Sequence, residues 1–198
     1  MADMQKIKQL RELTQAGLGD CKKALEESGD DLDNAIKWLR EKGKSIAGKK
    51  ASRSANEGLV HSYIHPPGKV GVMLEINCES DFVAKHEDFV SLANDICMHV
   101  AAISPRYLSP DDVSEDDLAK EREIFRNQTL QEGKPEHIVD KIIDGRMRKF
   151  YEENCLLKQS FVKDPDKSIE QLVTESIAKF GENIKINRFV RYQVGEAA

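Results

Sequence analysis

The sequence predicts an α+β protein in which an N-terminal three-helix module precedes a mainly helical core with a small antiparallel sheet. Apolar residues recur at helical spacing in three short segments near the amino terminus. Two segments with strand character follow, and the second alternates apolar and polar residues. In the rest of the chain, helical patterns outnumber strand patterns, which is typical of the α+β class.

Length and charge limit the classes of protein that the chain can represent. It has 198 residues, 39% hydrophobic and 33% charged, enough for one ordinary domain and a small accessory one. Its formal net charge of -5 does not attract phosphate backbones or anionic membranes. The amino terminus lacks the apolar core of a signal peptide, and no stretch approaches the ~18 apolar residues of a membrane span. We therefore expect a cytoplasmic protein with neither a membrane nor a direct nucleic-acid partner.

Residues 1–43 predict the helical module, because glycines separate three amphipathic segments that can pack together. Asp20 is placed to cap the second helix, and either Asp30 or Asp31 to cap the third. Gly43 is expected to end the third helix. The residues expected to face inward are Ile7, Leu10 and Leu13 in the first helix, Cys21, Ala24 and Leu25 in the second, and Leu32, Ala35, Ile36 and Leu39 in the third.

Residues 44–56 predict a basic linker, because they contain lysine and arginine but no acidic residue. Two interpretations stay open at this point. The segment either contacts RNA or an acidic partner, or it serves as a solvated tether or an extension of the third helix.

Residues 57–198 predict the α+β core, which opens with a hairpin of strands 59–65 and 70–78. Alternation in the second strand predicts one covered face, with Met73 on the other. The covered face is formed by Val70, Val72, Leu74, Ile76 and Cys78.

The remaining pattern predicts four helices and a last strand at 184–194. The first helix follows Val83 and carries Phe89, Leu92, Ile96, Val100 and Ile103 on one side; the others span 114–130, 135–150 with Ile138, Ile142 and Ile143 inward, and 168–180. A small sheet leaves an exposed edge or face, such as that of Met73 and Phe189, on which a second copy of the chain can dock.

The motifs of common enzymes and cofactor sites do not occur. The sequence contains neither phosphate-binding nor dinucleotide-binding glycine loops, and neither G-x-S-x-G nor H-E-x-x-H. His61 and His65 would lie roughly 13 Å apart on a strand, too far to share a metal ion bound at about 2 Å. The four cysteines form no C-x-x-C pair and are expected to be reduced thiols. We therefore expect no enzyme, no cofactor and no metal site.

The tetrapeptide from Ser80 to Val83 is the most distinctive feature, since Phe82 follows an acid, Asp81, at a strand-to-helix turn. One interpretation is structural: Ser80 or Asp81 caps a helix and Phe82 packs onto it. In the other, the aromatic ring is a probe for a partner. The residues alone leave both open.

The stretch from Asn77 to Lys85 reads N-C-E-S-D-F-V-A-K and resembles the N-C-x-T-D-F-V-A signature of the bacterial elongation factor Ts family. Residues 10–25 are similar to the opening motif of that family, and shorter stretches around His99, Gly133, Gly145 and Phe161 resemble it as well, so that the similarity covers essentially the whole chain. Ser80 replaces the usual threonine but keeps its hydroxyl. The chain holds one core unit where longer members hold two.

This resemblance implies a partner, elongation factor Tu in its GDP form, from which the chain releases GDP so that GTP can bind. The implied site is the tetrapeptide: Phe82 wedges between helices of the partner, and Asp81 disturbs the surroundings of its magnesium ion. Ser80 and Val83 fix the loop. The chain itself breaks no bond.

Secondary contacts follow from the same resemblance. Residues 1–43 resemble a ubiquitin-associated-like domain that presents Leu18 to the partner. His99 is implied as a contact near the phosphate-binding loop of the partner, although its apolar neighbours in the sequence equally suit a core histidine. The single core unit implies a homodimer in a 2:2 complex. Two alternatives remain: an RNA-binding translation accessory that uses the basic linker, or an adaptor that binds peptides or ubiquitin-like surfaces.

Overall fold

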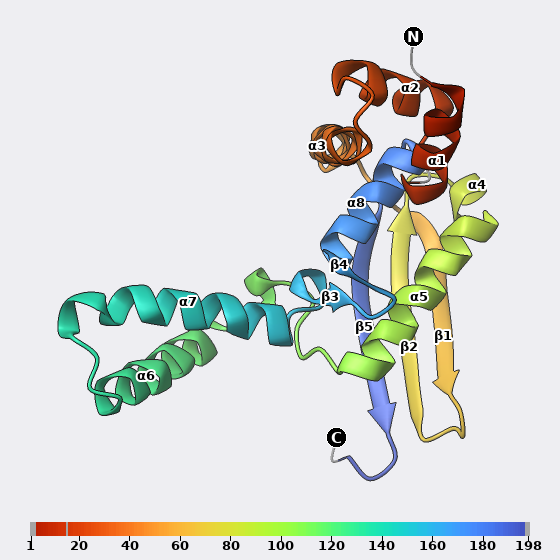
Figure 1. Cartoon of the computed structure of the whole chain (residues 1–198). Helices are drawn as coiled ribbons and strands as arrows, with labels where there is room; N and C mark the ends of the chain where they lie inside the picture. The colour runs from red at the N-terminus through yellow and green to blue at the C-terminus, as the bar shows by residue number, and fades with distance from the viewer. Residues whose placement is uncertain (1–2, 15, 197–198) are drawn as a thin grey trace. The chain divides into compact units, whose positions relative to one another are not determined.

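A computed structural model describes residues 3–14 and 16–196. In these ranges the chain forms helices α1 to α8 and strands β1 to β5 (Figure 1). Three strands form one small sheet in the order β1-β2-β5, and β3 and β4 form a second, two-stranded sheet. The predicted α+β class is confirmed.

The chain divides into two compact units, each built from separate segments. Unit 1 contains Met1–Val60, Glu75–Ser91 and Gln171–Asn187. Unit 2 contains His61–Leu74, Leu92–Glu170 and Arg188–Ala198.

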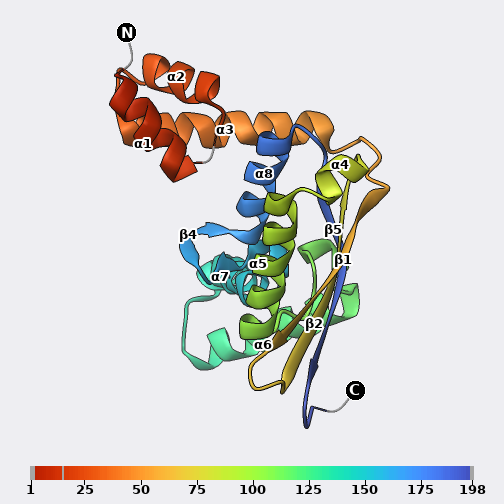
Figure 2. The ribbon, with the colours of Figure 1, turned by 90° about the vertical axis from the view of Figure 1, so that its right-hand side faces the viewer.

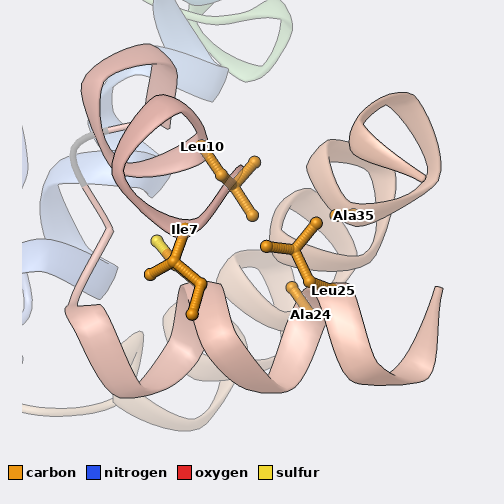
Figure 3. Packing of buried hydrophobic residues seen from close by; sticks show 6 residues of the cluster. Ile7, Leu10, Ala24, Leu25 and Ala35 are labelled. Carbon is orange, nitrogen blue, oxygen red and sulfur yellow. The ribbon is translucent and has the colours of Figure 1, made fainter. Parts of the chain in front are cut away.

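The first three helices of unit 1 are α1 (Met4–Thr14), α2 (Leu18–Glu27) and α3 (Leu32–Lys50). Each contributes to one apolar cluster, because helical spacing places its apolar residues on one side. Figure 3 shows the side chains of Ile7, Leu10 and Leu25 gathered between the helices. The buried members are Ile7, Leu10, Cys21, Ala24, Leu25 and Ala35, all of them predicted to face inward.

Two details of this module differ from the prediction, and one choice that it left open is decided. Leu13 is 59% exposed, because it lies near the end of α1, beyond the cluster. Asp20 lies in the first turn of α2, whose N-cap is Gly17. Of the two candidates for the cap of α3, the structure selects Asp31, whose Oδ1 accepts a hydrogen bond from the Asn34 N–H at 2.8 Å.

The third helix does not end at Gly43. Gly43 is buried within α3, and the helix continues to Lys50 (Figure 2). A Cβ atom at this position would lie 3.9 Å from the side chains of Thr174 and Ala178 in α8 (Ile169–Phe180). The glycine therefore occupies a helix–helix contact instead of a helix end. The first part of the predicted basic linker is consequently an extension of α3.

The three-stranded sheet contains β1 (Glu57–His65), β2 (Val70–Cys78) and β5 (Lys185–Gln193). Met73 is 51% exposed, while the alternating residues predicted for the covered face of β2 are buried from Val72 to Cys78. Gly58 has φ 144, and a Cβ atom there would meet the carbonyl oxygen of Ile76 at 2.2 Å. Only glycine allows β1 to pass β2 this closely.

The helical pattern after Val83 forms two helices, the one-turn α4 (Asp81–Ala84) and α5 (Glu87–Ile103). The predicted inner side of α5 is buried from Phe89 to Val100. Ile103 is exposed, since it is the last residue of the helix.

In unit 2, α6 (Glu115–Gln131) and α7 (Glu136–Asn154) form a helical hairpin (Figure 1). Its core contains Val139, Ile143, Met147 and Phe150, whereas Ile138 and Ile142 are only half-buried. The sequence prediction missed four short elements, which are too brief for a periodic pattern: β3 (Ser160–Phe161), β4 (Asp164–Ser168) and the 3-10 turns Pro110–Asp112 and Leu156–Lys158. Within the described residues, no helix is long and apolar enough to cross a membrane.

Candidate functional site

Ser80 joins the end of β2 to the one-turn helix α4. Its backbone is extended, with φ -129 and ψ 155, and its Oγ accepts a hydrogen bond from the Val83 N–H at 3.4 Å. This is the N-cap arrangement, which satisfies one of the free N–H groups of a helix start. Ser80 is therefore the cap, and Asp81 is the first residue of the helix.

Phe82 points into solvent, with 83% of the residue exposed. This excludes the interpretation in which its ring packs onto the following helix. Burying a phenylalanine side chain contributes about 1.5–3 kcal/mol, and the fold forgoes that contribution here. Val83, the next residue, is half-buried. The helix α4 thus presents one large apolar ring on a fixed backbone.

Asp81 places a negative charge beside this ring. The Nζ of Lys85 lies 2.7 Å from its Oδ2, one helical turn further along. The hydrogen bond and the charge of Lys85 lower the pKa of the Asp81 carboxyl below its ordinary value of 3.8. Asp81 is therefore ionised at neutral pH, and half of its side chain remains exposed.

The start of α4 is fixed by residues from the turn between α8 and β5. The Glu182 carboxylate accepts hydrogen bonds from the backbone N–H groups of Glu79 and Ser80, at 3.1 and 3.0 Å. It also accepts from the Ser80 hydroxyl at 2.6 Å. In return, the Glu79 carboxylate accepts from the Asn183 N–H at 2.6 Å. Glu182 and Asn183 could not be predicted from the sequence, because no local pattern relates residues this far apart in the chain.

His99 lies in α5 and is fully buried. The Val162 N–H donates to its Nδ1 at 3.3 Å, so Nε2 carries the proton and donates to Gln159 Oε1 at 2.9 Å. Burial lowers the pKa of His99 below its ordinary value of 6.5, and the Gln159 hydrogen bond opposes this in part. The structure therefore places His99 in the core of unit 2, whereas Ser80 to Val83 belong to unit 1.

Leu18 is the first residue of α2 and is 52% exposed. Met4 and Leu13 of α1 are exposed as well. The helical module therefore carries apolar side chains that its own cluster does not bury.

The histidines of β1 and the basic cluster of α7 make polar contacts within the protein. The His61 ring nitrogen Nε2 lies 3.4 Å from Asn94 Oδ1, and His65 Nδ1 lies 2.9 Å from the Tyr63 hydroxyl. Arg146 of the basic cluster in α7 pairs with Glu132 at 2.6 Å. Among residues 3–14 and 16–196, no group of three or more His, Cys, Asp or Glu side chains could hold a metal ion.

All four cysteines are free and buried, as expected. Burial raises the pKa of the Cys97 thiol to about 12, and also raises the pKa values of Cys21, Cys78 and Cys155. These thiols are protonated at neutral pH and therefore unreactive.

Comparison with known proteins gives a consistent result. The family model described as "Elongation factor TS" matches residues 2–196. A protein named Elongation factor Ts from Moorella thermoacetica is 56% identical over 190 residues, which cover 96% of this chain and 94% of that protein. A protein of the same name from Thermoanaerobacter sp. is 54% identical over 196 residues, which cover 99% of this chain and 96% of that protein. The protein of this name from Desulforamulus reducens is 56% identical over 190 residues, which cover 96% of this chain and 88% of that protein.

Proposed function

The chain belongs to the elongation factor Ts family and is a translation elongation factor of protein biosynthesis, and on this premise we propose that it is a guanine-nucleotide exchange factor. It binds elongation factor Tu in its GDP form and promotes the release of GDP, after which GTP binds. The chain transfers no group and breaks no bond, so in this proposal it is not an enzyme. It acts by binding one conformation of its partner more tightly than another.

The observation that carries this proposal is the exposure of Phe82. A ring with 83% exposure, held on a capped helix next to an ionised carboxylate, is suited to insertion into another protein. We propose that Phe82 enters between helices of the partner. Ser80 and Val83 hold the backbone from which the ring projects.

The proposed role of Asp81 is electrostatic. A magnesium ion at a nucleotide site is the largest local charge there and requires near-ideal octahedral coordination by oxygen. A carboxylate brought close to that coordination shell competes for its ligands or for the hydrogen bonds that orient them. Lys85 is 76% exposed in its side chain, which leaves it room to release Asp81 during binding.

Linkage sets the size of the effect. If the bound factor weakens nucleotide binding roughly 10^3-fold, the nucleotide weakens factor binding equally, a coupling of about 4 kcal/mol. Exchange is therefore reversible, and its direction depends on the ambient GTP.

The proposal is tested by stopped-flow measurement of GDP release from elongation factor Tu. Phe82→Ala and Asp81→Ala should each slow factor-stimulated release by at least about tenfold, the scale of an interface hot spot. Ile124→Ala is the matched control, because Ile124 is an exposed apolar residue of α6. Release unchanged by both site variants contradicts the proposed mechanism.

We propose further that residues 1–43 act as a ubiquitin-associated-like module, joined through 44–56 to the core of residues 57–198, and that Leu18 contacts the partner. The exposure of Leu18 supports this role. For His99, both ring nitrogens are engaged inside the core. We therefore propose that it packs rather than contacts the partner, which is the second of the interpretations that the sequence left open.

We also propose a homodimer that forms a 2:2 complex with the partner. Ile64, Met73, Val190 and Tyr192 of unit 2 are exposed apolar residues on strands of the sheet. We call these four residues the outer sheet patch; its Met73 lies on the face of β2 opposite to the buried Val72 and Leu74. Phe189 was expected on this surface but is half-buried. Val190 and Tyr192 of the same strand are exposed instead.

A further inference from the structure

Two glutamates exchange hydrogen bonds between distant parts of unit 1. The Glu182 carboxylate accepts from the Glu79 N–H, the Ser80 N–H and the Ser80 hydroxyl. The Glu79 carboxylate accepts from the Asn183 N–H, and its Oε2 lies 3.4 Å from Arg53 Nη1. The Asn183 side chain donates in turn to the Arg53 carbonyl at 2.8 Å. We call this set of contacts the Glu182 latch.

The latch acts on α4 through one hydroxyl group. Ser80 Oγ donates its proton to Glu182 and accepts the Val83 N–H, so the same atom connects the carboxylate to the helix cap. Glu182 thereby fixes the orientation of the Ser80 hydroxyl. Because the hydroxyl proton points to the carboxylate, a lone pair of Ser80 Oγ is directed to the Val83 N–H of α4.

A helix as short as α4 needs such external support. It spans only Asp81–Ala84, and helix nucleation is unfavourable for so few residues. Phe82 contributes nothing to its packing because the ring is exposed. Val83 and Ala84 are only half-buried, so α4 has little packing of its own, and the latch adds hydrogen bonds at its start.

The latch contacts are charge-assisted, and such bonds are roughly twice as strong as those between neutral groups. The Asn183 N–H is the main cause that lowers the pKa of Glu79 below its ordinary value of 4.5. The two carboxylates accept hydrogen bonds from different donors, so they do not compete for the same N–H groups. Backbone N–H groups thus donate to both glutamates, and Arg53 adds an ion pair to Glu79.

From this arrangement we propose that Glu182 is a positioning residue for the exchange loop, by which we mean Ser80 to Val83. Its carboxylate fixes Ser80 and so determines the direction in which Asp81 and Phe82 project from the end of β2. The inference rests on the proposed exchange function. Glu182 acts through Ser80, whereas Phe82 and Asp81 act on the partner.

The first test needs no partner. Amide hydrogen exchange of the free protein, measured by NMR, should show faster exchange at Ser80 and Val83 in Glu182→Ala than in the wild type. Val72 and Leu74 in β2 should keep their protection, because they do not depend on the latch. Glu152→Ala removes an exposed glutamate of α7 and serves as the matched control. Ser80 protection unchanged in Glu182→Ala overturns the proposed anchoring.

Two milder variants keep the test informative if Glu182→Ala disturbs the fold. Glu182→Gln retains one acceptor oxygen for the backbone N–H groups, so its exchange rates should fall between those of wild type and Glu182→Ala. Ser80→Ala keeps both backbone N–H contacts to Glu182 but removes the cap. In Ser80→Ala, the exchange rate of the Val83 amide should therefore rise more than that of the Ser80 amide. The reverse order would show that Glu182 does not act on α4 through the Ser80 hydroxyl.

The second test measures GDP release over a range of factor concentrations. Glu182→Ala should lower the plateau rate by about tenfold while the half-saturating concentration changes much less, since the other contacts with the partner remain. In the double variant with Phe82→Ala, Glu182→Ala should have a smaller effect than in the wild type, because only Asp81 is left to position.

The outcomes separate the two proposals. If Phe82→Ala slows release and Glu182→Ala does not, the positioning role is wrong and the exchange function stands. If the two substitutions have additive effects, Glu182 does not act through the loop. If wild-type protein does not accelerate release at all, the exchange function is wrong and the positioning role falls with it, whatever the amide protection shows.

Discussion

At the scale of single residues, the exchange loop combines one side chain that is free with neighbours that are held. Phe82 has no packing role, whereas the Ser80 hydroxyl makes two hydrogen bonds and Asp81 pairs with Lys85. Rigid support lowers the entropy that the loop loses when a partner orders it. Both of these Ser80 contacts need only a hydroxyl group, which the serine supplies.

A residue-scale prediction concerns His99 and pH. Its folded-state pKa lies below 6.5, so the unfolded chain binds more protons as the pH falls through this region. The contribution of neutral His99 to stability is therefore fully present above about pH 6.5 and is lost as the pH falls toward the lower, folded-state pKa. The free energy of unfolding in urea should consequently decline between about pH 7.5 and about pH 5.5.

The matched variant for this prediction is His99→Gln, which removes the titrating group and keeps hydrogen-bonding atoms. It is expected to be less stable than wild type at neutral pH but to lose less stability on acidification. Equal pH slopes for the two proteins would show that His99 does not titrate on unfolding in the way its burial indicates.

At the scale of elements, α2 allows packing and recognition to be separated. Leu25 is fully buried in the cluster shown in Figure 3, while Leu18 of the same helix is half-exposed. Leu25→Ala should destabilise the module by about 2–5 kcal/mol, the usual range for a buried leucine. Leu18→Ala should change stability by less than about 0.5 kcal/mol but weaken binding to elongation factor Tu.

Thermal unfolding and titration of the partner measure these two quantities. A Leu18→Ala protein that unfolds early, or that binds as tightly as wild type, contradicts the assignment of Leu18 to the interface. The comparison uses two leucines of one helix that differ in burial.

The elements also show how far the sequence determines the fold. The bounds and alternation of β2 were predictable, because adjacent residues decide which face of a strand is buried. The end of α3 was not, since the role of Gly43 depends on α8, more than a hundred residues away. The same limit applies to the site: its four residues stand out locally, but Glu182 and the exposure of Phe82 follow only from tertiary contacts.

At the scale of the whole molecule, the outer sheet patch predicts self-association. Exposed apolar residues on the strands would be covered by a second copy of the chain. Met73→Glu places a charge in this patch and should shift the protein toward the monomer, as measured by sedimentation equilibrium. Ile124→Glu on α6 is the matched control, because it also replaces an exposed apolar residue by one negative charge. A wild-type chain that is monomeric at micromolar concentration contradicts the proposed dimer.

The central claim is that the Phe82 ring drives nucleotide release once the complex has formed. The most direct test is the plateau rate of GDP release from elongation factor Tu at saturating factor, compared between wild type and Phe82→Ala. At saturation, weaker binding no longer contributes to the difference. We predict that the plateau falls by at least about tenfold in Phe82→Ala. An unchanged plateau with only a higher half-saturating concentration would mean that the ring serves binding alone, which contradicts the claim.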